Sequence, residues 1–248
     1  MLTVSCNPQI VDRPASQPSP KDTQRMVLRL LIAIGESDCE NIGGGFLAQP
    51  VNAVSSLAFL VFGIIALFSM SSRATAERSN RLVFGALMIA TGIGSVLFHG
   101  PQGQASKYLH DVTFVVTLLA IATMNLAGIL GWSQRRTWTN LGGVSAVVAT
   151  LLLVWPSSTN AIAGLTFLSL VGVDVALRRS GTIHRRWWFT AVVAMVVAGL
   201  FFASGRTGGP LCDSSSLFQG HALWHVLSAT ALWAYFQSTT PVRIDTET

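Results

Sequence analysis

Two pairs of polar residues stand at helical spacing within otherwise apolar sequence. Ser95 and His99 are four positions apart near the end of one apolar run, and His221 and His225 are four apart at the start of another. A spacing of four places both members of a pair on one face of a helix. Three imidazoles can fill three positions of a tetrahedral zinc site and leave the fourth to water, as metal-activated hydrolysis requires. The same pattern also suits histidines that only hydrogen-bond to neighbouring helices.

A carboxylate, Asp111, opens a third apolar run. Ionisable groups within hydrocarbon cost a few kcal/mol and are usually retained for function, which makes Asp111 a candidate catalytic residue. Three other ionisable residues are interpreted as structural. His110 precedes Asp111 at a helix start, His184 lies among arginines, and Asp174 can pair with Arg178 one helical turn later.

The segments that must position these residues are apolar and long. Of 248 residues, 50% are hydrophobic and only 11% are charged, whereas about 25% are charged in a soluble globular protein. Runs of about 18 to 25 apolar residues can cross a hydrocarbon core of about 30 Å as helices. The apolar runs predict seven such spans, at 46–70, 82–99, 110–131, 138–155, 160–177, 187–204 and 219–237. We therefore predict an all-α membrane protein, a seven-transmembrane helix bundle.

The sixteen basic residues are distributed unevenly between the two sides of such a bundle. Alternate connections and the C-terminal tail carry ten of them: Arg73, Arg78, Arg81, Arg135, Arg136, Arg178, Arg179, Arg185, Arg186 and Arg243. The other connections carry only Lys107 and Arg206. The positive-inside rule then places the C-terminus in the cytoplasm and the N-terminus outside. Because the net charge of +5 is explained by topology, nucleic acid is excluded as a partner.

This topology brings the candidate residues to one depth. The span that ends with Ser95 and His99 runs outward, and the spans that begin at Asp111 and at His221 both start outside. All of these side chains are therefore expected near the outer face of the membrane. We expect a leader over residues 1–36, disordered except for an amphipathic helix at 26–34, because its first 25 residues are polar and rich in proline. The membrane domain should span 37–238, with a cytoplasmic tail at 239–248.

Four segments of this chain resemble a known family. They are Asp38-Cys39-Glu40-Asn41, Ala48-Gln49-Pro50-Val51-Asn52-Ala53-Val54-Ser55, Gly94-Ser95-Val96-Leu97-Phe98-His99 and Gly220-His221-Ala222-Leu223-Trp224-His225. In type and order they resemble the alkaline ceramidases and their bacterial ceramidase-domain relatives. These belong to the CREST superfamily of seven-span membrane hydrolases. The resemblance runs from about residue 37 to residue 238.

The resemblance implies a zinc-dependent hydrolase of linear amide C–N bonds. It implies that His99, His221 and His225 hold zinc, that Asp111 orients or deprotonates the attacking water, and that Ser95 steadies the water or the developing oxyanion. The expected substrate is the N-acyl amide of a ceramide-like lipid, cleaved to a fatty acid and a sphingoid-type amine. Its chains would enter sideways from the membrane lipids, to a site near the periplasmic or luminal face. No protein partner is predicted.

The resemblance also implies a calcium site beside the zinc. Asp38, Glu40, Asn41 and the Cys39 carbonyl would supply the hard oxygen ligands that calcium prefers. The family has Glu where this chain has Gln49, so one carboxylate is replaced by an amide oxygen. The alternative is that these residues form a capping and turn cluster where the first span begins.

Two further features follow from the resemblance. Family members pair cysteines at the positions of Cys39 and Cys212, which implies a disulfide between these two residues in an oxidising compartment. Relatives commonly read Arg-Thr-x-Asp after the sixth span, whereas this chain reads Arg206-Thr207-Gly208-Gly209 and lacks that acidic group.

The sequence leaves two alternative functions to compare with hydrolysis. A receptor of the adiponectin-receptor type, from the same superfamily, would use the zinc site structurally or hydrolyse only weakly. Such receptors carry a folded cytoplasmic domain before the first span, whereas this charge pattern puts a short leader outside and favours the ceramidase branch. A transporter is disfavoured because the sequence has no broken-helix signal and no inverted repeat.

Overall fold

The computed structural model describes residues 36–69, 75–179 and 183–239, and every regular element within these ranges is helical. The elements are η1 (Glu36–Asp38), α2 (Pro50–Ser55), α3 (Leu57–Phe68), α4 (Thr75–His99), α5 (Gln104–Leu130), α6 (Gln134–Val154), η2 (Pro156–Ser158), α7 (Thr159–Arg179), α8 (Arg185–Ser204) and α9 (Gly220–Thr239). The all-α prediction is confirmed for this part of the chain. Almost all of the expected leader, including the helix predicted at 26–34, and the tail from residue 240 lie outside the described residues.

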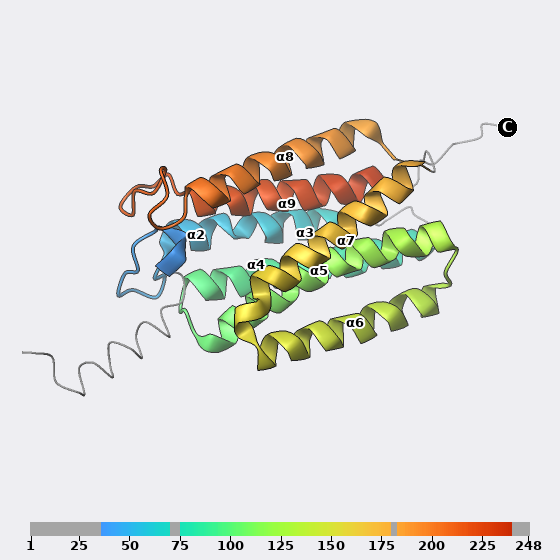
Figure 1. Ribbon diagram of the computed structural model, residues 1–248, viewed down its shortest axis with the longest axis horizontal. Helices are drawn as coiled ribbons and strands as arrows, with labels where there is room; N and C mark the ends of the chain where they lie inside the picture. Colours follow the sequence, from blue (N-terminus) through green and yellow to red (C-terminus); the bar gives the residue numbers. More distant parts are fainter. Residues whose placement is uncertain (1–35, 70–74, 180–182, 240–248) are drawn as a thin grey trace, which may run out of the picture. The chain divides into compact units, whose positions relative to one another are not determined.

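The long helices pack side by side in the bundle, some with their neighbours in the chain and some with helices far along it. α8 packs against α9, α9 against α3, α3 against α4, and α4 against α5, which also contacts α6 and α7. The short helix α2 contacts both α4 and α9. Figure 1 shows the long helices running alongside one another, with α7 crossing in front of α5 at an angle. The end of α4 and the start of α9 therefore meet at one end of the bundle, with α2 between them.

The first predicted span, at 46–70, is interrupted in the structure. α2 ends at Ser55 and α3 begins at Leu57, so Ser56 separates them. The hydroxyls of Ser55 and Ser56 both donate to the carbonyl oxygen of Asn52, at 2.9 Å and 2.7 Å. Serine hydroxyls that bond back to an earlier carbonyl compete with the helical ladder and bend the helix. The interruption places both hydroxyls beside the histidines described below.

Within the described ranges, six helical segments are long and apolar enough to cross a membrane, which identifies an integral membrane protein. The α2–α3 segment counts as one of the six, and α9 is not among them. α9 contains two histidines and several small polar residues, and more than half of its residues are buried against other helices. A helix surrounded by protein has less need of an apolar surface than one that faces lipid. The count of seven spans thus stays a prediction.

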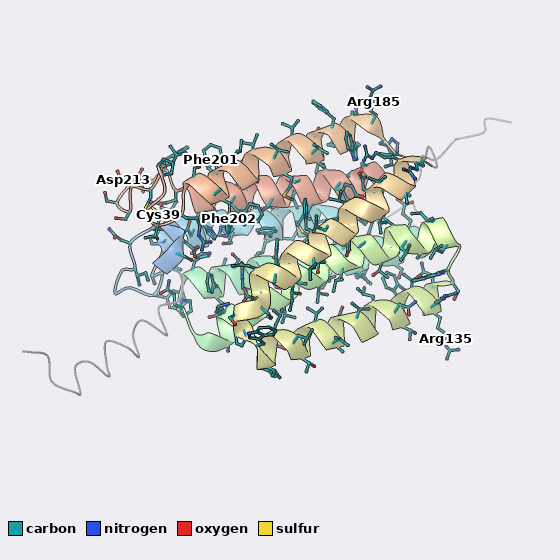
Figure 2. The ribbon with its side chains drawn as sticks, in the orientation of Figure 1. Cys39, Arg135, Arg185, Phe201, Phe202 and Asp213 are labelled. Carbon is teal, nitrogen blue, oxygen red and sulfur yellow. A yellow bond between two sulfur atoms is a disulfide. The ribbon has the colours of Figure 1, made fainter. Side chains whose placement is uncertain are left out.

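The two ends of the bundle differ in charge. Figure 2 shows Arg135 and Arg185 at the end opposite Cys39 and Asp213. A tryptophan accompanies the arginines there: the Arg136 guanidinium lies 4.6 Å from the ring centre of Trp132. The separation of charge agrees with the pattern used to predict topology, although which end faces the cytoplasm stays a prediction.

A buried polar cluster joins four helices toward the arginine-rich end. Asp174 on α7 forms the predicted ion pair with Arg178 at 3.0 Å. Its carboxylate also accepts hydrogen bonds from Trp188 Nε1 at 3.1 Å and from the Tyr235 hydroxyl at 3.2 Å. Asn125 Nδ2 donates to the same Tyr235 hydroxyl at 3.3 Å. The structural interpretation of Asp174 is thus confirmed and extended, because this one carboxylate connects α7 to α8 and α9.

Candidate metal centre

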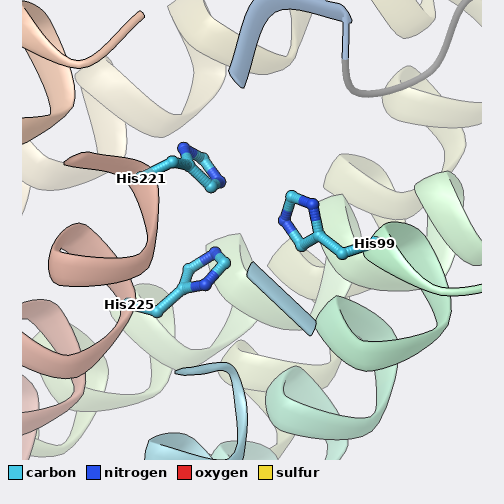
Figure 3. A group of neighbouring side chains, drawn as sticks. All are labelled: His99, His221 and His225. Carbon is cyan, nitrogen blue, oxygen red and sulfur yellow. The ribbon is translucent and has the colours of Figure 1, made fainter. Parts of the chain in front are cut away.

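Three buried histidines converge where α4 ends and α9 begins. His99 is the last residue of α4, and His221 and His225 lie one turn apart at the start of α9. Each offers one ring nitrogen, and these atoms all lie within 4.8 Å of one another. Figure 3 shows the three rings facing a common centre. Within the part of the chain that the structure describes, this is the one group of three or more His, Cys, Asp or Glu side chains placed to share a metal ion.

Gln49 determines which nitrogen of His99 is free. The Gln49 Nε2 donates to the Glu40 carbonyl at 3.0 Å, so the orientation of its amide is fixed. Its Oε1 therefore faces His99 Nδ1, 2.8 Å away. Because an amide oxygen can only accept, Nδ1 carries the proton and Nε2 keeps its lone pair. That Nε2 is buried and has no hydrogen-bond partner among the described residues, as expected of a metal ligand.

His225 is oriented in the same way by α2. Its Nδ1 lies 3.2 Å from the Asn52 carbonyl oxygen and 2.9 Å from the Ser55 hydroxyl. The Ser55 hydroxyl already donates to that carbonyl, so both neighbours accept from Nδ1. Nε2 is left with its lone pair. An acceptor behind each ring is the usual arrangement around metal-bound histidines, because it fixes the tautomer and the ring orientation.

His221 is the histidine whose ring makes the fewest hydrogen bonds. Its two nitrogens are buried, and neither has a hydrogen-bond partner among the described residues. The closest acid is Asp38, whose Oδ1 lies 3.6 Å from His221 Nδ1. Arg206 lies 3.5 Å from the same oxygen. Burial raises the pKa of the Asp38 carboxyl above its ordinary value, and Arg206 opposes this rise. A buried imidazole with unpartnered nitrogens is costly unless a bound group completes it.

Ser95, predicted as catalytic, lies beside the histidines. Its hydroxyl is 2.8 Å from the Ser56 hydroxyl and 3.5 Å from His225 Nε2. Because Ser56 donates its own hydrogen to the Asn52 carbonyl, the hydrogen of Ser95 is directed to Ser56. The lone pairs of Ser95 are then available as acceptors next to His225.

Asp111, the other predicted catalytic residue, is held in a polar group on α5. Its carboxylate bonds to Lys107, to His110 Nδ1 at 2.9 Å and to the Thr159 hydroxyl at 2.9 Å. Among the described residues it makes no hydrogen bond to the three histidines. The Phe98 ring separates the two groups, with its centre 4.8 Å from that of His99 and 5.0 Å from that of His110. His110, interpreted as structural, is thus a direct partner of Asp111.

The donor set fits a zinc ion. Three imidazole nitrogens are the ligands that catalytic zinc sites use, with one position left for water. In His99 and His225 the Nδ1 atom is bonded to an acceptor. The Nε2 of His99 and both ring nitrogens of His221 are buried and have no hydrogen-bond partner among the described residues. All three histidines are buried, and the ring centre of Phe202 lies 5.8 Å from that of His221.

The residues expected to bind calcium are engaged within the protein. The Glu40 carboxylate accepts the backbone N–H groups of Val51 and Asn52, at 2.7 Å and 2.8 Å, and so caps the start of α2. Asn41 is exposed, and its backbone N–H donates to the Ser214 carbonyl. With Gln49 bridging Glu40 to His99 and Asp38 paired with Arg206, these residues match the capping and turn cluster that was the alternative. They form no open cage of oxygen ligands, so the structure does not support calcium here.

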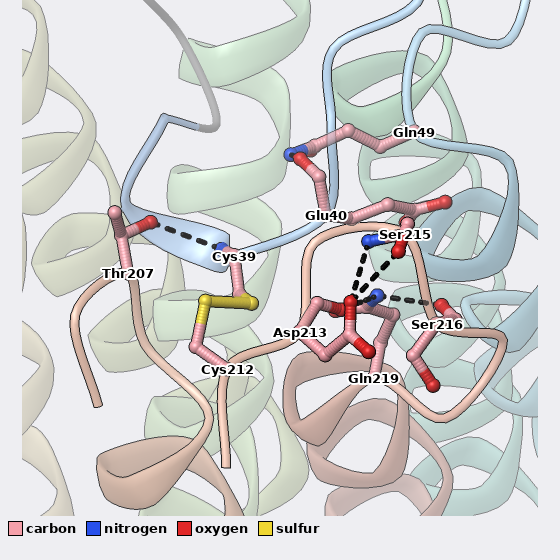
Figure 4. Close-up of a disulfide and its surroundings, with 9 residues drawn as sticks. All are labelled: Cys39, Glu40, Gln49, Thr207, Cys212, Asp213, Ser215, Ser216 and Gln219. Carbon is pink, nitrogen blue, oxygen red and sulfur yellow. Dashed lines mark hydrogen bonds between the residues drawn. A yellow bond between two sulfur atoms is a disulfide. The ribbon is translucent and has the colours of Figure 1, made fainter. Parts of the chain in front are cut away.

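The predicted disulfide is confirmed. Cys39 and Cys212 are joined, with Cα atoms 5.6 Å apart and a separation of 173 positions along the chain. Figure 4 shows the bond beside the hydrogen bond, 3.2 Å long, from the Cys39 backbone N–H to the Thr207 hydroxyl. The disulfide ties the segment that carries Asp38 to the loop between α8 and α9. It thereby holds Asp38 next to His221.

A contact between two glycines sets the position of the α9 histidines. Gly205 ends α8 and Gly220 begins α9. A Cβ added to Gly205 would lie 2.6 Å from the Cα of Gly220, and one added to Gly220 would lie 2.7 Å from the Cα of Gly205. No larger residue fits at either position without moving backbone. The close approach fixes the first turn of α9, and with it His221.

Comparison with known families supports the same conclusion. The family model named Ceramidase matches residues 44–248, which is most of the chain. The chain belongs to the ceramidase family. This membership confirms the resemblance read from the four sequence segments, and it supports hydrolysis of the amide bond of ceramide-type lipids.

Several residues of this ceramidase-family site carried no signal in the sequence. Ser56 was not predicted, although its hydroxyl contacts both Ser95 and His225. Gln49 was expected only as a calcium ligand, whereas it orients His99. Thr159, which bonds to Asp111, begins a helix far along the chain. A spacing pattern shows which residues share a helix face, but partners brought by another helix become visible only in the fold.

Proposed function

We propose that this protein is a zinc-dependent amidohydrolase that cleaves the N-acyl amide of a ceramide-like lipid within the membrane. The observation that supports it most is the set of three buried histidines, two of them held with Nδ1 protonated and with Nε2 left for a metal. The products are a fatty acid and a sphingoid-type amine. Water supplies the hydroxyl of the acid and the hydrogen gained by the amine.

The histidines would hold the zinc ion, which would supply a Lewis acid for the carbonyl and would lower the pKa of a water molecule to about 7. Ser95 accepts a hydrogen from the attacking water, since its own hydrogen is directed to Ser56. Asp111 would take the proton from that water and later return it to the leaving amine, through one intervening water or after a shift of Phe98, because that ring separates it from the histidines. General acid–base catalysis of this kind contributes about 10²–10⁴-fold to the rate.

The surroundings suit a substrate that arrives from the bilayer. His99 and His225 are at most 1% exposed, and both belong to helices that line an apolar bundle. The amide bond of a lipid can reach buried histidines of this kind while the hydrocarbon chains of the lipid stay among the membrane lipids. We place the site near the periplasmic or luminal face, on the charge pattern of the helix connections.

Purified protein should contain one zinc ion per chain and release fatty acid from N-acyl lipids. His221→Ala should lose both zinc and turnover, as measured by metal analysis and by fatty-acid release. Asp111→Asn should keep zinc and lose turnover by about 10²–10⁴-fold, because the ligands survive and the base does not.

His184→Ala is the matched control. His184 is the residue just before α8, and its side chain makes no capping hydrogen bond. This variant should keep both properties. If His221→Ala retained zinc and turnover, the proposed centre would be wrong. Equal loss of zinc in Asp111→Asn would make Asp111 a structural residue instead of a catalytic one.

A further inference from the structure

Asn52 has a fully buried polar side chain that makes no hydrogen bond within the described part of the fold. Its exposed fraction is 0%. Among the described residues, neither its Nδ2 nor its Oδ1 has a hydrogen-bond partner. An unmade hydrogen bond at a buried amide costs about 1–3 kcal/mol, so such a group calls for an explanation, such as a catalytic role or a bound partner.

The backbone of Asn52, in contrast, is fully engaged. Its N–H donates to the Glu40 carboxylate at 2.8 Å. Its carbonyl oxygen accepts from His225 Nδ1 at 3.2 Å and from two serine hydroxyls. These bonds hold the Cα of Asn52 firmly beside the histidines. The side chain is thus presented from a rigid backbone, although nothing in the described fold binds it.

The two residues that flank α2 show which way the Asn52 side of this helix is turned. Gln49, three residues earlier, bonds to His99, and Ser56, four residues later, contacts His225 and Ser95. Residues three and four apart lie on one helical face. Asn52 stands between two residues that reach two different histidines. It therefore lies on the face of α2 that covers the metal centre.

We propose that the Asn52 side-chain amide binds the lipid amide during hydrolysis, with Nδ2 donating to the carbonyl oxygen of the scissile bond. The inference rests on the proposed function and adds a contact to substrate. Negative charge develops on this oxygen as water attacks, and a donor held in place in a buried site stabilises it without having to reorganise. Oδ1 is then left to accept a hydrogen from a hydroxyl of the same lipid.

The test uses Asn52→Leu and Asn52→Ala in the full chain, purified in detergent. Three quantities are measured: zinc per chain, the melting temperature of metal-free protein, and kcat and KM on an N-acyl lipid. We expect zinc content to match the wild type. The melting temperature of Asn52→Leu should be equal or higher, because an unsatisfied buried amide is replaced by an apolar group of similar size. Turnover should fall by about 10²–10³-fold, mainly in kcat, as when an oxyanion donor is removed.

Asn125→Leu is the matched control, because Asn125 is also a buried asparagine but already donates to the Tyr235 hydroxyl. It should lower the melting temperature and leave kcat unchanged. If Asn52→Leu lowered the melting temperature as much as the control and kept kcat within threefold of wild type, Asn52 would be structural and the inference wrong. Loss of zinc from both Asn52 variants would also overturn it. A wild type that binds zinc but hydrolyses no lipid amide would instead contradict the proposed function.

Discussion

The tautomers of His99 and His225 are set by residues outside the histidine set. Gln49 can present only its oxygen to His99, because its nitrogen is committed to the Glu40 carbonyl. The chain of contacts runs on from Glu40 to the backbone of α2. One carboxylate thus orders the start of a helix and, through a glutamine, the tautomer of a metal ligand.

Replacing Gln49 by leucine should weaken zinc binding without removing a ligand. His99 would lose the acceptor that fixes its ring, and loss of such a partner typically costs about 10–100-fold in metal affinity. Competition with a chromogenic chelator measures this change. Gln134→Leu, at an exposed position on α6, is the control and should bind zinc as the wild type does. Unchanged zinc affinity in Gln49→Leu would show that His99 needs no support from Gln49.

At the scale of elements, the segment before α2 and the loop after α8 act as one unit. Hydrogen bonds join them at Asn41 to Ser214 and at Thr207 to Ser37, in addition to the disulfide. The pair covers the histidine end of the bundle and carries both Asp38 and Arg206. Its order is needed if Asp38 is to stay near His221.

Removing the disulfide should therefore loosen the centre as well as the fold. Cys39→Ser, Cys212→Ser and the double variant should each lose about 2–5 kcal/mol of stability, the usual range for a native disulfide. Thermal unfolding with and without zinc measures the loss. The double variant should be no less stable than either single one, since the same bond is missing in all three.

Cys6→Ser is the control for this series and should behave as the wild type in both measurements. If reduced and oxidised wild-type protein unfolded at the same temperature, the disulfide would contribute nothing to stability.

The architecture was the part of the molecule most open to prediction from sequence. Helices are found where long apolar runs predicted them, because hydrocarbon requires every backbone group to be satisfied within a helix. His99, His221 and His225 were also predictable, since few polar residues interrupt those runs. The break at Ser56 was not, because it depends on hydroxyls that bond to an earlier carbonyl. Nor was the separation of Asp111 from the histidines by Phe98, which depends on how α4 packs against α5.

The orientation of the whole molecule is a prediction that fusion reporters can test. With the N-terminus outside and the C-terminus in the cytoplasm, a C-terminal green fluorescent protein should fluoresce, and a C-terminal alkaline phosphatase should stay inactive. The physical reason is the excess of arginine at the end marked by Arg135 and Arg185. A fusion at Asp213, in the loop at the other end, is the control and should give the opposite pair of results. An active C-terminal phosphatase would show that the topology is the reverse of the predicted one, with the histidines on the cytoplasmic side.

The contact between Gly205 and Gly220 limits how this chain can vary. Neither residue has a side chain to offer to chemistry, yet a single added carbon at either one would meet backbone at 2.7 Å or less. The first turn of α9 would have to shift, and His221 and His225 would shift with it. Freedom to accept substitutions is thus small at two positions without functional groups, whereas many exposed apolar residues can exchange one apolar side chain for another. A variant of this chain that keeps its histidine centre intact therefore needs glycine at both positions.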